Sequence, residues 1–128
     1  MVRRYIVKAA AWLEIVVGAI FIAVPNIPCA LLFGANVDNI GTALARWVGV
    51  SLLALGIACL PSKAGESHRN AVLGLLVFNA GVTVLFVWVG VVAKVHGVLL
   101  WPAVILHAVI ALALLRHLMT TRSAVAYM

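Results

Sequence analysis

The hydrophobic positions of this chain fall into four long runs, which short polar or proline-containing connections separate. The runs extend over residues 5–24, 41–60, 71–93 and 97–118. Each approaches or exceeds the roughly 20 residues that a helix needs to cross about 30 Å of hydrocarbon. No stretch alternates polar and apolar residues as a strand of a membrane barrel would. Because backbone polar groups must be paired within such a span, the pattern predicts four transmembrane helices.

The connections predict how these helices are arranged. Pro25 and Pro28 remove backbone donors, so we expect the first helix to end near Val24. The apolar run 29–33, closed by Gly34, is too short to cross a membrane. We expect it to lie in the interface or to dip back as a re-entrant segment. The remaining connections are short, which makes neighbouring helices antiparallel partners.

Composition supports one membrane-embedded domain. The chain is 66% hydrophobic and 9% charged, and no part of it has the composition of a soluble appendage. The predicted fold class is therefore all-α, an integral membrane four-helix bundle that forms a single domain over residues 1–128. Glu14 interrupts the first apolar run and no small-residue cleavage site follows it. These features favour a retained helix over a cleaved signal peptide.

The positive charge predicts an orientation in the membrane. The formal net charge is +6, but the basic residues lie at the ends of the apolar runs and form no single basic face, so we expect no nucleic-acid partner. Seven of the nine Lys and Arg residues share one side if both termini and the middle loop lie there. The positive-inside rule makes that side the cytoplasm, which predicts cytoplasmic N- and C-termini. These seven are Arg3, Arg4, Lys8, Lys63, Arg69, Arg116 and Arg122.

We single out five charged or strongly polar residues inside the predicted spans, because such residues are costly there and are candidates for function. Counting along the helices places Glu14, Asn79, Thr83 and His107 in one layer only several Å thick. Arg46 lies roughly 7 Å farther out, a distance that its long side chain can cover. Small residues three or four positions away indicate that these faces meet protein instead of lipid. We therefore predict that all five form a polar interior that binds a ligand or a proton.

More than one use of this polar interior remains open. Glu14 could stay ionised beside Arg46, and His107 could accept a hydrogen bond, move a proton or bind a metal ion. The same residues could instead lock the register of the bundle, with each hydrogen bond contributing about 0.6–2 kcal/mol. Gly74 and Gly81, one heptad apart, are interpreted as helix-packing residues.

No motif assigns a cofactor, a metal or a catalytic residue. His107 is the only histidine near the middle of a predicted span, and His117 lies about 15 Å away along the same helix, too far to share a metal ion. We therefore predict no metal site. A haem with one axial histidine or a bound quinone remains open without a motif to support either. The sequence contains no CxxCH, HExxH or phosphate-binding glycine loop, and we favour a protein that is not an enzyme.

Three segments carry a resemblance to a known family. Leu31 to Gly34, Arg46 to Gly49 and Leu53 to Gly56, after a first helix that ends at Pro25, resemble small bacterial four-helix membrane proteins of the DoxX-like type. The resemblance extends over most of the chain. It implies a multi-pass protein of the bacterial inner membrane, and some members of the family are attached to redox or quinone-linked systems. It implies no particular activity.

A second resemblance concerns the first helix. Ala10 to Gly18, with Glu14 between them, is similar to the carboxylate-bearing helix of small multidrug resistance transporters, which also have four helices. In those proteins the carboxylate exchanges protons for a cationic drug. This chain departs from that pattern, because Arg46 and His107 add cationic character to the core and the aromatic residues of those transporters are not matched.

We therefore expect a small accessory subunit or ligand-binding module of a membrane assembly, in contact with the lipid bilayer and present as a homo-oligomer or within a larger complex. The alternative is a proton-coupled transporter that uses Glu14. A third hypothesis is an intramembrane redox protein that binds haem or quinone through His107. The three hypotheses share the same candidate residues and differ in what those residues bind.

Overall fold

The computed structural model describes residues 2–60 and 69–126, and the side-chain surroundings of residues 5–60 and 69–120. The described chain forms the helices α1 (Val2–Ala23), α2 (Asn26–Phe33), α3 (Asn39–Cys59), α4 (Arg69–Val91) and α5 (Leu100–Ala126). Four of these helices contain segments that are long and apolar enough to cross a membrane, Tyr5–Ala23, Asn39–Cys59, Arg69–Val91 and Leu100–Thr120. The predicted all-α membrane bundle is confirmed.

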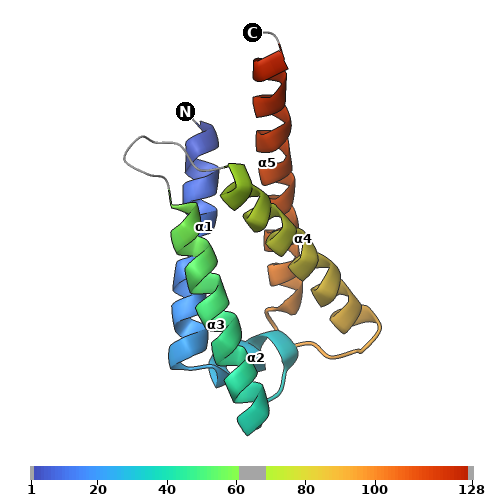
Figure 1. The fold of residues 1–128 in the computed structure, drawn as a ribbon. Helices are drawn as coiled ribbons and strands as arrows, with labels where there is room; N and C mark the ends of the chain where they lie inside the picture. The colour runs from blue at the N-terminus through green and yellow to red at the C-terminus, as the bar shows by residue number, and fades with distance from the viewer. Residues whose placement is uncertain (1, 61–68, 127–128) are drawn as a thin grey trace.

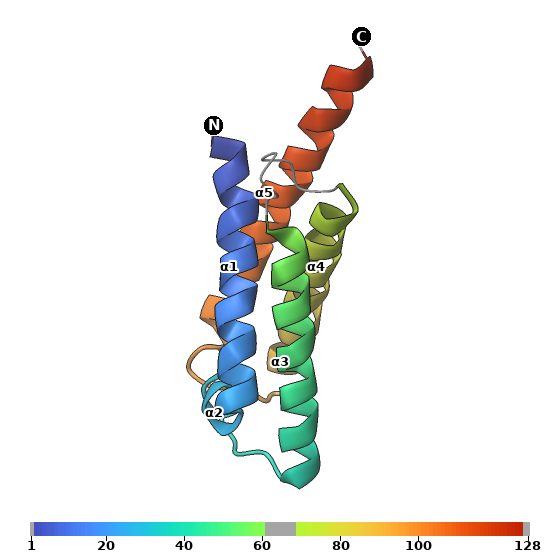
Figure 2. The ribbon, with the colours of Figure 1, turned by 60° about the vertical axis from the view of Figure 1, so that its left-hand side comes forward.

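The long helices form two pairs. α1 packs along α3 and α4 packs along α5, while contacts between the two pairs are much less extensive. Figure 1 shows α1 beginning and α5 ending at the same end of the bundle, with α2 lying across the opposite end. The rotated view in Figure 2 shows the same arrangement. We call these the terminal end and the α2 end.

Glycines bring α1 and α3 close together. A Cβ atom on Gly18 would lie 2.7 Å from the carbonyl oxygen of Gly49, and one on Gly56 would lie 2.6 Å from that of Ala11. Small residues at such positions let two helix backbones approach within a membrane. The buried face of α3 consists of Ala45, Gly49, Leu52, Gly56 and Cys59, with spacings of three and four residues.

The packing role expected of Gly74 and Gly81 is not observed. A Cβ atom on Gly81 would meet nothing within 4 Å, and one on Gly74 would meet only the Cδ1 atom of Leu55, at an ordinary 3.6 Å. The glycines that bring two helix backbones together lie between α1 and α3, whereas Gly90 of α4 lies close to the side chains of Leu100 and Trp101 on α5.

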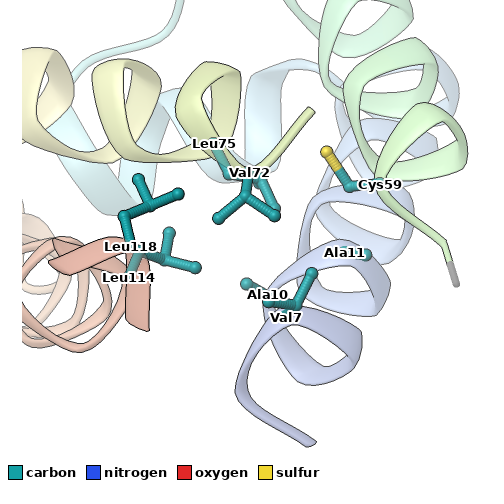
Figure 3. Packing of buried hydrophobic residues seen from close by; sticks show 8 residues of the cluster. All are labelled: Val7, Ala10, Ala11, Cys59, Val72, Leu75, Leu114 and Leu118. Carbon is teal, nitrogen blue, oxygen red and sulfur yellow. The ribbon is translucent and has the colours of Figure 1, made fainter. Parts of the chain in front are cut away.

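Two clusters of buried apolar side chains lie at different depths. The first joins all four long helices toward the terminal end, and Figure 3 shows its members, Val7, Ala10, Ala11, Cys59, Val72, Leu75, Leu114 and Leu118. The second lies toward the α2 end and contains Phe21, Cys29, Ala45 and Leu52. In lipid, such clusters stabilise a bundle through van der Waals packing, because the surrounding tails are equally apolar. Glu14 lies between the two clusters along α1, and Asn79 lies one turn after Leu75 of the first cluster on α4.

The short apolar run after the first helix is the helix α2. It ends at Gly34, whose φ of 74° is left-handed and suits glycine. The backbone carbonyls of Leu31 and Leu32 accept hydrogen bonds from the N–H groups of Leu99, at 2.9 Å, and Gly97, at 2.7 Å. These bonds hold the connection between α4 and α5 against α2, so α5 begins at Leu100 and not at Gly97 as predicted. α2 therefore ties the two helix pairs together at this end.

Candidate functional site

Three of the five predicted site residues form one hydrogen-bonded chain. Glu14 on α1 is 1% exposed and Asn79 on α4 is 0% exposed. The Nδ2 group of Asn79 donates to Oε1 of Glu14 over 3.4 Å, and Nδ1 of His107 on α5 lies 2.7 Å from Oδ1 of Asn79. We call this arrangement the polar chain. It connects both helix pairs near the middle of the spans.

The hydrogen bonds of Asn79 determine where the proton of His107 lies. Nδ2 of Asn79 also donates to the backbone carbonyl of Leu75 at 2.9 Å, one turn earlier on α4. The amide nitrogen therefore faces Leu75 and Glu14, and the amide oxygen faces the imidazole. Because that oxygen only accepts, Nδ1 of His107 carries the proton and donates it. In the neutral ring this leaves the lone pair of Nε2 available to accept a further hydrogen bond.

Thr83 lies at the edge of this arrangement. Its hydroxyl donates to the backbone carbonyl of Asn79 at 2.8 Å, one turn earlier on the same helix. The hydroxyl proton is therefore engaged within α4 and is not donated to the polar chain.

Arg46 does not join the polar chain. Its side chain is exposed, and among the described residues Glu14 is bonded to Asn79 and not to a cation. The buried stripe of α3 passes through Ala45 and Gly49, and Arg46 follows Ala45 by one residue, or about 100° around the helix. Trp47, the next residue, is 70% exposed. The predicted pairing of Glu14 with Arg46 is wrong, because the glycine face of α3 turns toward α1 instead.

Aromatic rings surround the imidazole. The rings of Phe78 and Phe86 each lie 6.1 Å from the ring of His107, in edge-to-face geometry. Phe86 in turn contacts Phe33 of α2 edge-on, with centroids 5.9 Å apart. These phenylalanines are not among the site residues that the sequence predicted. The signal was present for Phe86, which follows Asn79 and Thr83 at helical spacing on one face of α4.

The carboxyl group of Glu14 has unused capacity for hydrogen bonds. A carboxyl group can take part in several, and within the described part of the chain Glu14 has one, over a long 3.4 Å. No cation neutralises a carboxylate charge on Glu14 there, and no second donor stabilises it. An uncompensated charge at this depth is costly. The arrangement therefore suits a group that takes up a proton or a donor from a ligand. Residues 5–60 and 69–120 contain no group of three metal-ligating side chains close enough to hold a metal ion.

Comparisons of the chain with protein-family models, with curated proteins and with solved structures found no match. The geometry of the polar chain is therefore the basis for assigning a function.

Proposed function

We propose that this protein is a small integral membrane protein that acts as an accessory subunit or ligand-binding module of a membrane assembly. Its binding site is the polar chain of Glu14, Asn79 and His107. The observation that carries this proposal is the buried carboxyl group of Glu14, which has a single long hydrogen bond. Residues that served only to lock the bundle would satisfy a buried carboxyl group more completely, because unsatisfied polar groups in hydrocarbon are costly.

The other end of the polar chain supports the same proposal. His107 is only partly buried, and its Nε2 atom is the acceptor that the hydrogen bond to Asn79 leaves available. Phe78 and Phe86 provide apolar walls beside it. A ligand with an apolar body and a polar head matches such a site, since most small-molecule sites combine apolar walls with a few polar groups.

We also propose that the protein lies in the bacterial inner membrane with both termini cytoplasmic, and the DoxX-like resemblance remains part of this proposal. The beginning of α1 and the end of α5 both lie at the terminal end, which is consistent with a shared side for the termini.

Purification in a mild detergent followed by native mass spectrometry tests the binding proposal. We expect the wild-type protein to carry a partner subunit or a small molecule, and Glu14→Gln to lose it while remaining helical. Arg46→Gln is the matched control, because it also replaces a charged residue within a span but lies outside the polar chain. Two results together would contradict the proposal. The purified wild-type protein would carry no partner or small molecule, and membrane complexes would assemble normally in cells from which the protein has been deleted.

A proton-coupled transporter is the second candidate, and the position of Arg46 favours it more than the sequence did. The sequence predicted both Arg46 and His107 in the core, where cationic character would disfavour a cationic substrate. The Arg46 side chain is exposed, so that part of the objection no longer applies, whereas His107 lies in the polar chain. A transporter with Glu14→Gln should stay folded and lose proton-driven efflux of a cationic dye from proteoliposomes. Unchanged efflux in that variant would exclude Glu14 as the exchanging carboxylate.

A further inference from the structure

A hollow of about 280 Å³ lies between α1 and α5 at the terminal end of the bundle. Ile6 of α1 lines one side, and Ala113, Arg116, His117 and Thr120 of α5 line the other. It is separate from the polar chain, because Arg116 follows His107 by nine residues, about 14 Å along the helix. The hollow therefore needs its own explanation.

The chemistry of the lining favours an anion. The guanidinium group of Arg116 is exposed and forms no ion pair with Glu14 or Asp38, the two acidic residues that the structure describes. Glu14 is buried within the bundle, and Asp38 caps α3 at the α2 end. The Thr120 hydroxyl is engaged with the backbone carbonyls of Arg116 and His117. Arg116 is thus the group that would hold a negatively charged ligand, and its planar fork suits a phosphate.

The position of the hollow favours a lipid over a soluble anion. The fourth apolar run of the sequence ends at Leu118, so Arg116 and Thr120 lie about where the hydrocarbon gives way to head groups. Leu112 and Leu115 are exposed on the same helix and extend from this level toward the middle of the span. An acyl chain could lie along them while its phosphate reaches the guanidinium group. Basic pockets between helices on the cytoplasmic side are known to hold such head groups.

We propose that this hollow binds the phosphate head group of an anionic phospholipid, held by Arg116, in the leaflet that contains the terminal end. Ile6 and Ala113 supply the apolar floor, and the acyl chains follow the exposed leucines of α5. The site is independent of any ligand at Glu14 or His107.

Native mass spectrometry of delipidated protein, titrated with phosphatidylglycerol or phosphatidylcholine, tests this proposal. We expect Arg116→Gln to weaken phosphatidylglycerol binding about fivefold, the effect of one basic residue at a membrane surface. Arg69→Gln is the matched control, since it removes the same charge at the same end of the bundle but lies outside the hollow. It should leave binding within a factor of two. Ala113→Leu, which narrows the hollow without changing charge, should also weaken binding.

Each other outcome counts against the site. Equal losses in Arg116→Gln and Arg69→Gln would mean that the lipid responds to overall charge and not to the hollow. Equal binding of phosphatidylcholine would remove the role of the anionic head group, and displacement of lipid by millimolar inorganic phosphate would show a soluble-anion site. Circular dichroism of each variant confirms that the helices are intact before binding is compared.

Discussion

Asn79 connects more of the buried polar groups than either ionisable residue beside it. Its amide donates to Glu14 and to the carbonyl of Leu75, and its oxygen accepts from His107. An amide can do this because it carries a donor and an acceptor on one rigid plane, whereas a carboxylate can only accept. The residue is fully buried, so none of these groups has water as an alternative partner.

Replacing Asn79 with Leu, which has similar volume and no polar atoms, should therefore be costly. The change leaves Glu14 and His107 without their partner, and we expect a loss of about 1–3 kcal/mol in the free energy of unfolding. Thr83→Val is the control on the same face, and it removes one hydrogen bond within α4, about 0.6 kcal/mol or less. Unfolding in mixed micelles measures both. Equal losses would show that the polar chain contributes no more than a local bond.

A double-mutant cycle tests whether Glu14 interacts with Arg46, as the sequence predicted, or with Asn79, as the structure shows. Glu14→Gln and Arg46→Gln should have additive effects on the free energy of unfolding, within about 0.5 kcal/mol, because the two side chains do not meet. Glu14→Gln and Asn79→Leu share a hydrogen bond and should depart from additivity by more than that. A coupling above about 1 kcal/mol between Glu14 and Arg46 would contradict the described orientation of α3.

Depth along a helix was predictable for the site residues, and direction around the helix was not. Counting residues placed Glu14, Asn79 and His107 in one layer, and these three do meet. For α3, small residues flank Arg46 at helical spacing, but a second small face runs through Gly49 and Gly56. Only the approach of α1 decides which face is buried, and that contact joins residues more than 30 positions apart. A periodic pattern contains no information about such a choice.

At the scale of the helix pair, the glycines of α1 and α3 make a direct prediction. A methyl group on Gly56 would lie 2.6 Å from the Ala11 carbonyl oxygen and from the Ile15 Cγ1 atom, so Gly56→Ala must push the helices apart. We expect a loss of about 1–3 kcal/mol in the free energy of unfolding. Gly81→Ala is the matched control, since its methyl group meets nothing within 4 Å, and it should be neutral or stabilising by up to about 1 kcal/mol. Equal effects would show that α1 and α3 are not in close contact.

α2 shows what local sequence can establish about a short segment. Pro25 ends α1 and Gly34 ends α2, and both boundaries follow from the conformations that these residues allow. The packing of α2 against the connection between α4 and α5 could not be predicted in this way, because it depends on partners distant in the sequence. The hydrogen bonds from Gly97 and Leu99 to α2 are such partners, and nothing near residues 29–33 indicates them.

For the whole molecule, the number of spans and their antiparallel order could be predicted because hydrocarbon thickness and short connections leave few alternatives. The unequal contacts, extensive within the two pairs and sparse between them, could not be predicted. The two helix pairs are joined by specific hydrogen bonds at two places. One is the polar chain, and the other is the pair of bonds between α2 and the connection from α4 to α5.

The orientation of the whole bundle is tested by labelling. With Cys29 and Cys59 replaced by Ala, we expect Asn36→Cys to react with a membrane-impermeant thiol reagent in intact cells. Asn70→Cys, at the terminal end, should react only after permeabilisation. Both positions are exposed, and Asn36 leaves the cap formed by Asp38 intact. The positive-inside distribution of Lys and Arg is the physical basis. Labelling of Asn70→Cys alone in intact cells would reverse the topology.

The hydrogen-bonded link between α4 and α5 is the part of the polar chain that a single spectrum can observe. In protein labelled with 15N-histidine and reconstituted in lipid, the signal of His107 is assigned by its disappearance in His107→Phe. We predict that Nδ1 carries the proton and Nε2 does not, and that Asn79→Leu removes this preference, because the amide oxygen that accepts the proton is lost. A neutral ring protonated at Nε2 and unaffected by Asn79→Leu would contradict the polar chain.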